Sequence, residues 1–456
     1  MKIQVPEQVN FIINKLIAAG YEAYAVGGCV RDSILGRIPG DWDITTSAKP
    51  EEVKALFRRT IDTGIEHGTV TIMLDKTGYE VTTYRIDGEY EDNRHPKSVE
   101  FTSDLIEDLK RRDFTINAMA YNEEDGIVDA FCGLEDLNKK VIRCVGNPYD
   151  RFDEDALRIM RAVRFAAQLG FEIEEGTKDA IIEKGKFLRN ISAERIRVEL
   201  VKLITSMHPE LLLSAYELGI TKIVLPEFDE MVETEQLNPH HVYNVGEHSV
   251  RAVAAIRELV KDKPEIDDKT FMILCLTMLL HDSGKPATRT LDETGRDHFH
   301  GHQAVSEKIA KRVLKGLKFD NYTIDTVTKL VRHHDDRIQT TPLAMREATH
   351  VIGKELMPLF FIIQRADVMA QKPETQKEKL AKLQVLEALF LELMEKQYCV
   401  QLKELAINGK ELIRIGYQPG KEMGSVLNIL LQKVIEKPEL NNTEILTDLA
   451  LAMLSQ

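Results

Sequence analysis

The stretch AYAVGGCVRDSILGRIPGDWDITTS, residues 23–47, decides the fold of the first part of the chain. Ala23 to Val26 is a short apolar run that stops at two glycines, which is typical of a buried strand followed by a turn. The residues after the glycines predict a short helix, a loop and a second strand that carries Asp41 and Asp43. Side chains alternate along a strand, so these two carboxylates face the same way, with Cα atoms ~7 Å apart.

Two carboxylates at this spacing are suited to bridging a pair of Mg²⁺ ions. The glycines at positions 27 and 28 let the backbone approach an anion, and the helix that follows directs its positive end toward it. A lone D-x-D motif is usually a solvated strand edge, and a lone Gly-Gly pair is usually a turn. Found together within 17 residues, they favour two-metal transfer of a nucleotidyl group.

The size of the chain, 456 residues, predicts three or four modules rather than one core. Its five cysteines stand without C-x-x-C pairing, which favours a reducing cytosol and argues against a zinc ribbon or a disulfide framework. No run of 18 apolar residues is present, and the first residues read as an amphipathic helix rather than a signal peptide. We therefore expect a cytoplasmic protein without a membrane span.

The pattern of apolar residues changes near residue 150. Before it, β-type runs (TVTIML, EVTTYR, VEFT) mix with helical stretches, which predicts an α/β or α+β head. After it, strand signals nearly vanish and an elongated all-α region is expected. The helices predicted there span 154–169, 193–207, 209–218, 247–262, 268–281, 303–316, 341–352, 376–397 and 425–436. Prolines and charge changes divide the chain into a head at 1–145, a helical neck at 146–225, a helical body at 226–375 and a tail at 376–456.

The net charge of −14 argues against nucleic acid as a partner when it is taken alone. Basic clusters nevertheless occur, at Lys110 to Arg112, at Arg158 to Arg164 and at Arg195 with Arg197. Composition therefore does not decide whether the chain binds nucleic acid.

The segment Lys110-Arg-Arg-Asp-Phe-Thr-Ile-Asn-Ala118 joins three cations to an acid and an amide before it turns apolar. Its cations could neutralise a triphosphate leaving group. The plainer interpretation is a helix start capped by Asp113 or Thr115.

Asp155, Arg158, Arg161 and Arg164 recur every three residues and predict a charged stripe along one helix. Such a stripe is usually a solvated face, but the residues between are apolar, so the helix is embedded and its charges need partners. A base edge is one such partner, because Asp accepts from an exocyclic amine and Arg donates to the adjacent ring nitrogen. Cytosine and adenine both offer this pair, whereas uracil and guanine do not. The stripe therefore predicts selection of C and A without a template, by ~10⁴-fold or more.

A second set of polar residues, His248, His281-Asp282 and Asp367, lies in the helical region. Histidine and aspartate at helix ends suit a divalent metal with mixed nitrogen and oxygen ligands. His302, His333 and His334 could extend the site to two metals. A single histidine of this kind is usually structural, but the set resembles the HD phosphohydrolase superfamily. This resemblance implies a metal such as Mg, Mn, Ni or Co, and phosphatase or 2′,3′-cyclic phosphodiesterase action on RNA ends. HD modules can also persist as scaffolds.

The chain also resembles the class II tRNA nucleotidyltransferases, or CCA-adding enzymes, which are related to bacterial poly(A) polymerases. The matching pieces are VGGCVRD…GDWDI, RRDFTINAMA, DLNKKVIRCVGNPYDRFDEDALRIMRAVRFAAQLGF and ISAERIRVEL, within about residues 20–205. The resemblance implies a mixed-sheet nucleotidyltransferase head, then an elongated helical neck, an HD-type helical body and a helical tail. It implies ATP and CTP as substrates, and the 3′ end and elbow of tRNA as partner, for a monomer or homodimer.

The resemblance assigns roles to matching positions. Asp41 and Asp43 would hold Mg²⁺. The nucleotide would be bound by Gly28, Arg31, Arg112, Asp155, Arg158, Arg161 and Arg164. The segment 84–101 resembles the family's flexible loop, which favours addition through the final A, and the C-terminal region resembles the tail that grips tRNA.

Four functions therefore remain to be separated. The favoured one is addition of C, C and A to the tRNA 3′ end. An enzyme that adds only A, or a poly(A) polymerase, is the first rival. The others are a metal-dependent HD phosphohydrolase whose head only binds RNA, and a tRNA-binding scaffold with empty metal sites.

Overall fold

The computed structural model of the chain describes residues 2–88, 99–236 and 243–454. These residues form two compact units, Met1–Asp229 and Glu230–Gln456. The division falls inside helix α12 (Pro226–Val232). Finer boundaries at 145 and 375 stay a prediction.

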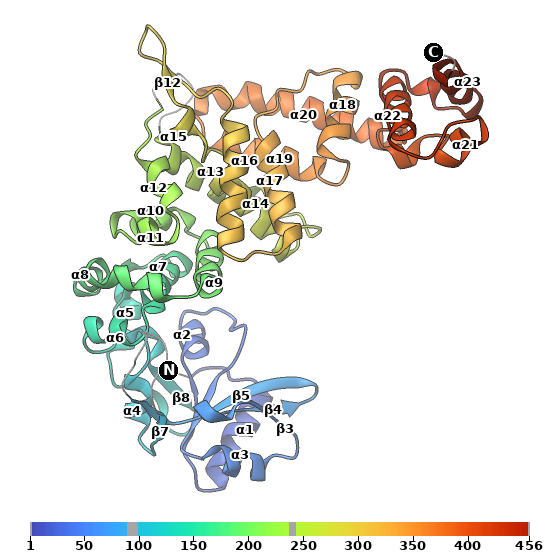
Figure 1. The fold of residues 1–456 in the computed structure, drawn as a ribbon. Coiled ribbons are helices and arrows are strands. Elements are labelled where there is room, and N and C mark those ends of the chain that lie inside the picture. Colours follow the sequence, from blue (N-terminus) through green and yellow to red (C-terminus); the bar gives the residue numbers. More distant parts are fainter. Residues whose placement is uncertain (1, 89–98, 237–242, 455–456) are drawn as a thin grey trace. The chain divides into compact units, whose positions relative to one another are not determined.

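A seven-stranded mixed sheet forms the centre of the head (Figure 1). Its strand order is β3-β4-β5-β2-β1-β8-β9, in which β2 and β5 are parallel and the other neighbours antiparallel. The strands are β1 (Ala23–Val26), β2 (Ile44–Thr46), β3 (Thr60–Gly64), β4 (Thr69–Leu74), β5 (Thr77–Thr83), β8 (Met119–Asn122) and β9 (Gly126–Asp129). Two shorter strands, β6 (Arg85–Asp87) and β7 (Val99–Phe101), pair with each other.

The strand β1 is buried along its whole length, as its apolar sequence predicts. Tyr24 and Val26 pack with Tyr84, Leu105 and Leu109 in one core cluster. Burial of each large side chain of this kind stabilises the fold by roughly 1.5–3 kcal/mol. The helices of the head are α1 (Glu7–Ala18), α2 (Gly28–Ile34), α3 (Pro50–Leu56), α4 (Leu105–Lys110) and α5 (Gly133–Lys139).

The predicted order of strand, glycine turn, helix, loop and strand is confirmed at 23–46, with one difference. Strand β2 begins only at Ile44, so Asp41 and Asp43 lie in the loop just before it. The backbone of Asp43 is nevertheless fixed, because Val26 N–H donates to its carbonyl at 3.0 Å. The two carboxylates are thus held at the end of the central strand pair.

The helices that follow the head begin with α6 (Pro148–Glu154) and α7 (Leu157–Leu169). The prediction of one helix over 154–169 is wrong at its start. Asp155 is non-helical, with φ −140° and ψ 102°, and its Oδ1 accepts the Leu157 N–H at 3.1 Å. Aspartate often competes for backbone donors in this way, and the chain therefore breaks between two helices.

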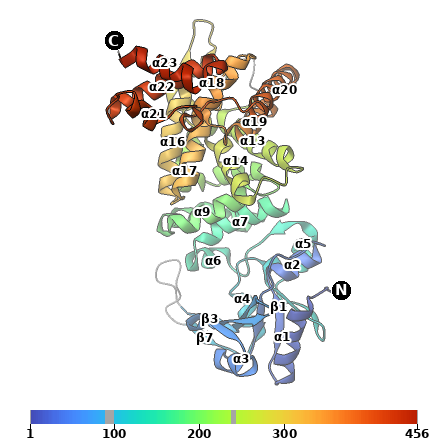
Figure 2. The same ribbon diagram turned by 90° about the vertical axis from the view of Figure 1, so that its right-hand side faces the viewer.

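Helix α7 packs against α9 (Ala193–Ile204), and the two lie side by side in both views (Figures 1 and 2). Around them are α8 (Glu175–Lys184), α10 (Leu212–Glu217), α11 (Thr221–Val224) and the pair β10 (Val141–Ile142) and β11 (Glu172–Ile173). One face of α7 is almost entirely buried, so packing fixes the position of the helix that carries the arginines of the charged stripe.

The second unit is helical apart from the short hairpin of β12 (Thr290–Leu291) and β13 (Asp297–His298), within the ranges that the structure describes. Helix α14 (Asp268–Leu280) is apolar on all sides and packs most extensively against three neighbours. These are α13 (Val245–Val260), α17 (Asn321–His333) and α19 (Met357–Met369). The other body helices are α15 (Lys285–Thr288), α16 (His302–Gly316), α18 (Pro342–Ile352) and α20 (Pro373–Glu395).

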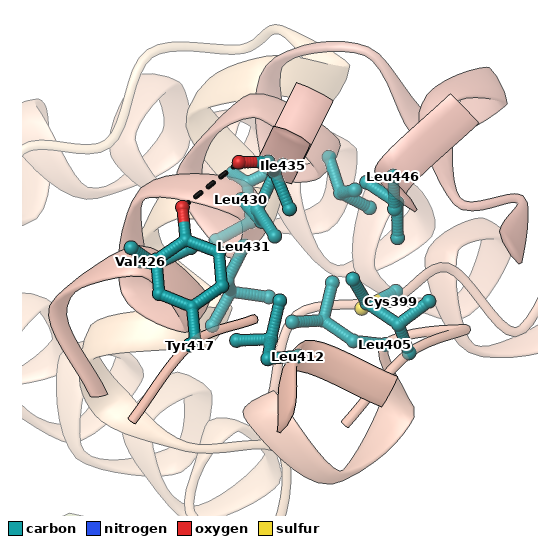
Figure 3. Packing of buried hydrophobic residues seen from close by; sticks show 12 residues of the cluster. Cys399, Leu405, Leu412, Tyr417, Val426, Leu430, Leu431, Ile435 and Leu446 are labelled. Atoms are coloured by element: carbon teal, nitrogen blue, oxygen red, sulfur yellow. Dashed lines mark hydrogen bonds between the residues drawn. The ribbon is translucent and has the colours of Figure 1, made fainter. Parts of the chain in front are cut away.

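The last helices, α21 (Gly409–Arg414), α22 (Lys421–Glu436) and α23 (Thr443–Leu454), enclose a small core of their own (Figure 3). Leu412, Leu430 and Leu446 are fully buried in it, and Tyr417 donates its hydroxyl hydrogen to the Ala450 carbonyl at 2.8 Å. The predicted fold class, a mixed-sheet head followed by helices, is confirmed. None of the described helices has the length and apolar character that crossing a membrane requires.

Candidate functional site

A cavity of about 480 Å³ in the first unit collects most of the polar residues that the sequence singles out. Eight cationic side chains and four carboxylates are among its lining residues, so it is locally basic in an acidic protein. The lining includes Gly27, Gly28, Arg31, Asp41, Asp43, Arg111, Arg112, Asp113, Asn117, Asp155, Arg158, Arg161, Arg164, Phe165, Arg195 and Lys202. Every nucleotide-site residue predicted from the sequence is in this set.

The turn after β1 requires glycine at position 27. Gly27 has φ +83°, a left-handed conformation that residues with a side chain rarely adopt. A Cβ atom here would also lie 3.1 Å from Nη1 of Arg112. The glycine therefore lets Arg112 approach the backbone at the end of the strand.

Asp41 and Asp43 share the mouth of the cavity, and both side chains are exposed to solvent. The pKa of Asp43 is raised, first because the protein withdraws its carboxylate from water and second because the Asp41 carboxylate is close, while Arg112 opposes the shift. A divalent cation would relieve the repulsion between the two carboxylates. Their oxygen donors fit Mg²⁺.

Two arginines beside these carboxylates are held in fixed positions. Arg31 makes a two-pronged ion pair with Asp32, at 2.9 Å for both contacts, and its Nη1 donates to Asn117 Oδ1 at 2.6 Å. Arg112 lies 3.5 Å from Asp108, and its buried Nε has no hydrogen-bond partner among the described residues. Both guanidinium groups are available to bind phosphate oxygens, which guanidinium recognises well.

The predicted base-reading residues also meet at the cavity. Asp155 Oδ2 accepts from Arg195 Nη2 at 2.7 Å. Arg158 is fixed by Glu154 Oε2 at 2.5 Å and by the carbonyl of Arg111 at 2.9 Å. A carboxylate has about four acceptor sites, so Asp155 retains capacity for a base amine. The buried Nη1 of Arg195 has no hydrogen-bond partner among the described residues.

The remaining two arginines of the predicted stripe have partners within the protein. Arg161 contacts Asp113 Oδ2 at 2.6 Å, and Arg164 contacts Glu199 of α9 at 2.8 Å. Burial opposes ionisation of Asp113, but Arg161 and the other hydrogen-bond and charge partners outweigh it and lower its pKa to about 2. Because these ion pairs supply a partner for each arginine, no contact with a base edge is needed to explain the two buried charges. The ion pairs hold helix α7 in place against the neighbouring elements.

Sequence reasoning missed three residues of the cavity. Asn117 anchors Arg31, Asp113 anchors Arg161, and Arg195 anchors Asp155. All three lie in segments that the sequence marks as basic or polar, but their partners are 40 to 86 residues away along the chain. Local patterns carry no signal for such pairings.

The second unit brings together six buried or half-buried histidines and aspartates from five helices or helix ends. His248 comes from α13, His281 and Asp282 follow α14, His302 begins α16, His334 follows α17 and Asp367 lies on α19. Asp282 is central: its Oδ2 faces His281 Nε2 at 3.2 Å and His248 Nε2 at 3.7 Å. Its Oδ1 faces His302 Nε2 at 3.3 Å and His334 Nε2 at 3.5 Å.

The four histidines of this cluster share one orientation. The Nδ1 of His281, His302 and His334 lies 2.7 or 2.8 Å from the carbonyl of the residue three positions earlier, and that of His248 lies 3.3 Å from the Ala370 carbonyl. A carbonyl only accepts, so each Nδ1 carries a hydrogen, and Nε2 is the ring nitrogen that each histidine turns toward the centre. Metal-binding histidines are held by such contacts.

Two atoms at the centre have charged neighbours but no well-directed hydrogen bond. His281 Nε2 and Asp282 Oδ2 are buried without a hydrogen bond of good geometry to any described residue, although Lys285 Nζ lies 2.7 Å from Asp282 Oδ2. Burial alone would lower the pKa of His281, but Asp282 and Asp367 outweigh it and raise that pKa to about 10. The two carboxylates thus favour positive charge at this position, as a metal site requires.

Gly284 explains how His302 reaches the cluster. A Cβ at Gly284 would lie 2.4 Å from the His302 carbonyl and 2.6 Å from Ser306 N, so only glycine lets α16 approach this closely. Gly284 has φ −87°, so its role is close packing rather than a left-handed helix stop.

His333 does not belong to the cluster, which corrects its inclusion among the possible ligands. Its Nδ1 lies 2.7 Å from Asp336, on the exposed side of the loop after α17. Successive residues at a helix end point in different directions, so only His334 faces inward. The segment 84–101 lies partly outside the described residues, at 89–98, and its role as a flexible loop stays a prediction.

Comparison with known proteins identifies three matching regions. Residues 23–143 match the poly(A) polymerase head domain. Residues 170–232 match a region described as a probable RNA and SrmB-binding site of polymerase A, and residues 300–450 match tRNA nucleotidyltransferase domain 2. The three matches follow the head, the neck and the second unit in order.

Similar proteins cover nearly the whole chain. The CCA-adding enzyme of Lacticaseibacillus paracasei is 36% identical over 442 residues, which span 93% of this chain and 90% of that protein. The CCA-adding enzyme of Levilactobacillus brevis is 36% identical over 444 residues, 95% of this chain and 96% of that protein. The crystal structure of the Bacillus stearothermophilus CCA-adding enzyme in complex with CTP has a TM-score of 0.71 at 30% identity, covering 99% of this chain and 98% of that one.

Proposed function

The chain belongs to the family of CCA-adding enzymes, which are tRNA nucleotidyltransferases, and we propose that it performs this reaction in the cavity of its first unit. It adds C, C and A to the 3′ end of tRNA, with CTP and ATP as substrates. The observation that carries the assignment is that the Asp41 and Asp43 carboxylates line the same cavity as Asp155 and Arg158. The residues for nucleotidyl transfer and the residues for base selection thus line the same cavity.

Asp41 and Asp43 hold the Mg²⁺ ions of the transfer site. When bound, Mg²⁺ activates the tRNA 3′-hydroxyl and neutralises the charge on the departing pyrophosphate. The 3′-oxygen forms a bond to the α-phosphorus as the bond to pyrophosphate breaks. Arg31 and Arg112 bind the phosphates, and the backbone turn at Gly27 and Gly28 leaves space beside them.

Asp155 and Arg158 select the base. The Asp155 carboxylate accepts from the exocyclic amine of cytosine or adenine, and Arg158 donates to the neighbouring ring nitrogen. Uracil and guanine would leave these groups facing atoms of the wrong polarity. The ion pair with Arg195 holds Asp155 in position for this contact, while Arg161 and Arg164 fix the helix from which Arg158 projects.

Incubation of the enzyme with tRNAs that end at the discriminator base, at C and at CC tests this function. With CTP and ATP present, all three should end in CCA and grow no further. Labelling of only the CC substrate would identify an enzyme that adds A alone, and growth beyond one A would identify a poly(A) polymerase.

A second function is supported by the orientation of the four histidines in the second unit. Their Nε2 atoms, with Asp282 and Asp367, form a divalent-metal site of the HD type, and the two oxygens of Asp282 divide it into two ligand sets. Mg, Mn, Ni and Co all accept such ligands. A metal held here would supply an activated water for phosphate-ester hydrolysis.

Metal analysis of the purified protein tests this second site. His281→Ala should lose the bound metal and any hydrolysis of bis(p-nitrophenyl) phosphate, while His333→Ala, a histidine outside the cluster, should retain both. Equal metal content in the two variants would refute the site. Hydrolysis that survives in His281→Ala would refute its catalytic role.

A further inference from the structure

One aromatic ring in the wall of the head cavity is surrounded by three arginines. Phe165, on α7, is buried and lines the cavity. The guanidinium carbon of Arg164 lies 3.6 Å from the centre of its ring, that of Arg31 lies 5.0 Å away and that of Arg161 lies 5.3 Å away. Phe114 packs against the same ring in a T-shaped arrangement. The ring of Phe165 thus joins Arg31, on α2, to two arginines of α7.

Three guanidinium groups around one ring would repel one another if nothing offset their charge. An aromatic face carries partial negative charge, and its attraction for a cation is stronger where water is excluded. A leucine would fill much of the same space but would offer no such face. Each arginine also pairs with one carboxylate: Arg31 with Asp32, Arg161 with Asp113 and Arg164 with Glu199.

Arg31 is the member of this group that the proposed function assigns to the nucleotide phosphates. Three of its N–H groups donate to Asp32 and Asn117. Since a guanidinium carries five N–H donors, one on each terminal nitrogen remains for a phosphate oxygen. A Cβ on Gly28 would lie 3.7 Å from Nη2, so this end of the guanidinium borders the glycine turn. Rotation of the guanidinium plane would turn both remaining donors away from a phosphate bound there.

A chain of hydrogen bonds connects Arg31 to α7 by a second route. Arg31 Nη1 donates to Asn117 Oδ1 at 2.6 Å, and Asn117 Nδ2 donates to Asp113 Oδ1 at 3.1 Å. Asp113 Oδ2 in turn pairs with Arg161 at 2.6 Å. Phe165 closes this chain, because Arg31 and Arg161 both lie over its ring. The orientation of Arg31 therefore depends on α7 as well as on its own helix.

We propose that Phe165 is a positioning residue for nucleotide binding, and that its ring holds Arg31 in the orientation that binds the phosphates. It thereby connects the phosphate-binding arginine of the head to the helix that carries Arg158. The inference rests on the function proposed above. Arg158 is not among the arginines found over the ring, so the effect of Phe165 is on nucleotide affinity and not on the choice of base.

Steady-state kinetics of CMP and AMP incorporation into tRNA test the proposal. Phe165→Leu should raise the KM for CTP and for ATP by about tenfold, the effect of losing a buried cation–π contact. The kcat should stay within about twofold, because the contact acts alike before and during the reaction. The preference for CTP over UTP should not change.

Two matched variants separate the role of the ring from packing alone. Phe165→Tyr keeps the ring and should have a KM within about twofold of wild type. Phe171→Leu should leave KM unchanged, since Phe171 is about as buried but lines a different cavity, beside Val163 of α7. If Phe165→Leu fails to fold, as judged by urea unfolding, Phe165→Met takes its place, because methionine adapts to irregular spaces in a core.

Arg31→Gln shows whether the effect passes through Arg31. The KM of the double variant Phe165→Leu/Arg31→Gln should be no higher than that of Arg31→Gln alone, because the ring then has no Arg31 to hold. Effects of the two changes that multiply would overturn the inference. An unchanged KM in Phe165→Leu, or an equally raised KM in Phe165→Tyr, would also overturn it. Absence of incorporation by the wild-type protein would instead refute the proposed function, and the inference with it.

Discussion

The head cavity and the histidine cluster are both suited to divalent metals, but they differ in donor atoms and in exposure. In the head, Asp41 and Asp43 offer only oxygen and are open to solvent. In the second unit, four histidines and Asp282 offer nitrogen and oxygen, and all five side chains are buried. Hard oxygen donors at an open mouth suit an ion that arrives and leaves with a nucleotide. A buried mixed set suits a resident ion.

The two sites also differ in the groups that surround them. Arginines, whose guanidinium groups suit phosphate oxygens, surround the head carboxylates, whereas backbone carbonyls orient the histidines of the second unit. The functions proposed above therefore build the first site around its substrate and the second around its metal. Variants that affect one site and spare the other therefore test the comparison.

The largest expected effect is on nucleotide incorporation. Asp43→Asn should reduce CMP and AMP incorporation into tRNA by on the order of 10³-fold or more, because metal ions contribute several kcal/mol of charge stabilisation. Metal content of the second unit should not change. Asp62→Asn, which changes an exposed carboxylate on strand β3 of the head, is the matched control and should remain active. Substantial incorporation by Asp43→Asn would refute the site assignment.

The converse variant affects the other site. Asp282→Asn removes the charge shared by both ligand sets and should weaken Co²⁺ binding by about 100-fold. Loss of a group that only hydrogen-bonds to a metal ligand already lowers metal affinity by about 10- to 100-fold, and loss of a ligand itself should lower it at least as much. Incorporation into tRNA should stay within about twofold of the wild-type rate. A large loss of incorporation would show that the two sites are coupled and would end their separation into independent centres.

A smaller effect is expected at Arg195, which orients Asp155. Arg195→Gln should lower the preference for CTP over UTP by about tenfold, since one charged hydrogen bond contributes about 1.5–3 kcal/mol. Arg197→Gln on the same helix is the control. The measurement is the ratio of kcat/KM values for addition to tRNA lacking CCA. An unchanged ratio with a lower kcat for both nucleotides would assign Arg195 a structural role only.

The smallest expected effect is on stability, through Asp113. Its pKa of about 2 lies below the ordinary 3.8, so its ionised form stabilises the folded head at pH values above about 4. This contribution, about 2 kcal/mol, is lost as the pH falls through 2. Asp113→Asn should therefore lower the urea midpoint of the head at pH 7, and the difference from wild type should shrink between pH 4 and 2. A difference that is constant with pH would contradict the ion-pair account.

The sequence was most informative where chemistry is local. Strand β1, the glycine turn and helix α2 follow one another within 23–34, and the apolar run and the glycines predict them. Strand alternation did not predict the arrangement of Asp41 and Asp43, because both lie in the loop before β2. The helix break at Asp155 was not predicted either, because its cause is a side chain that competes for a backbone donor. Helix α19 is apolar on most sides and so lacks the periodic signal that marks an amphipathic helix.

The pairings within the sites were the least predictable part. The sequence marked Arg161 and Arg164 as needing partners and offered a base edge as one candidate for the stripe, but it did not identify Asp113 and Glu199, which pair with them. In the second unit it could not choose between His333 and His334. The choice depends on which face of the last turn of α17 points to Asp282, and that orientation is set by packing between distant helices.

The most direct test concerns the claim that protein groups in the head cavity choose the base. The measurement is the ratio of kcat/KM for CTP to that for UTP in Asp155→Asn, with tRNA that ends at the discriminator base. Wild type should prefer CTP by on the order of 10⁴-fold, and the variant by less than about 10²-fold, because its amide can donate to the uracil carbonyl. An unchanged ratio, with both rates reduced equally, would contradict the account.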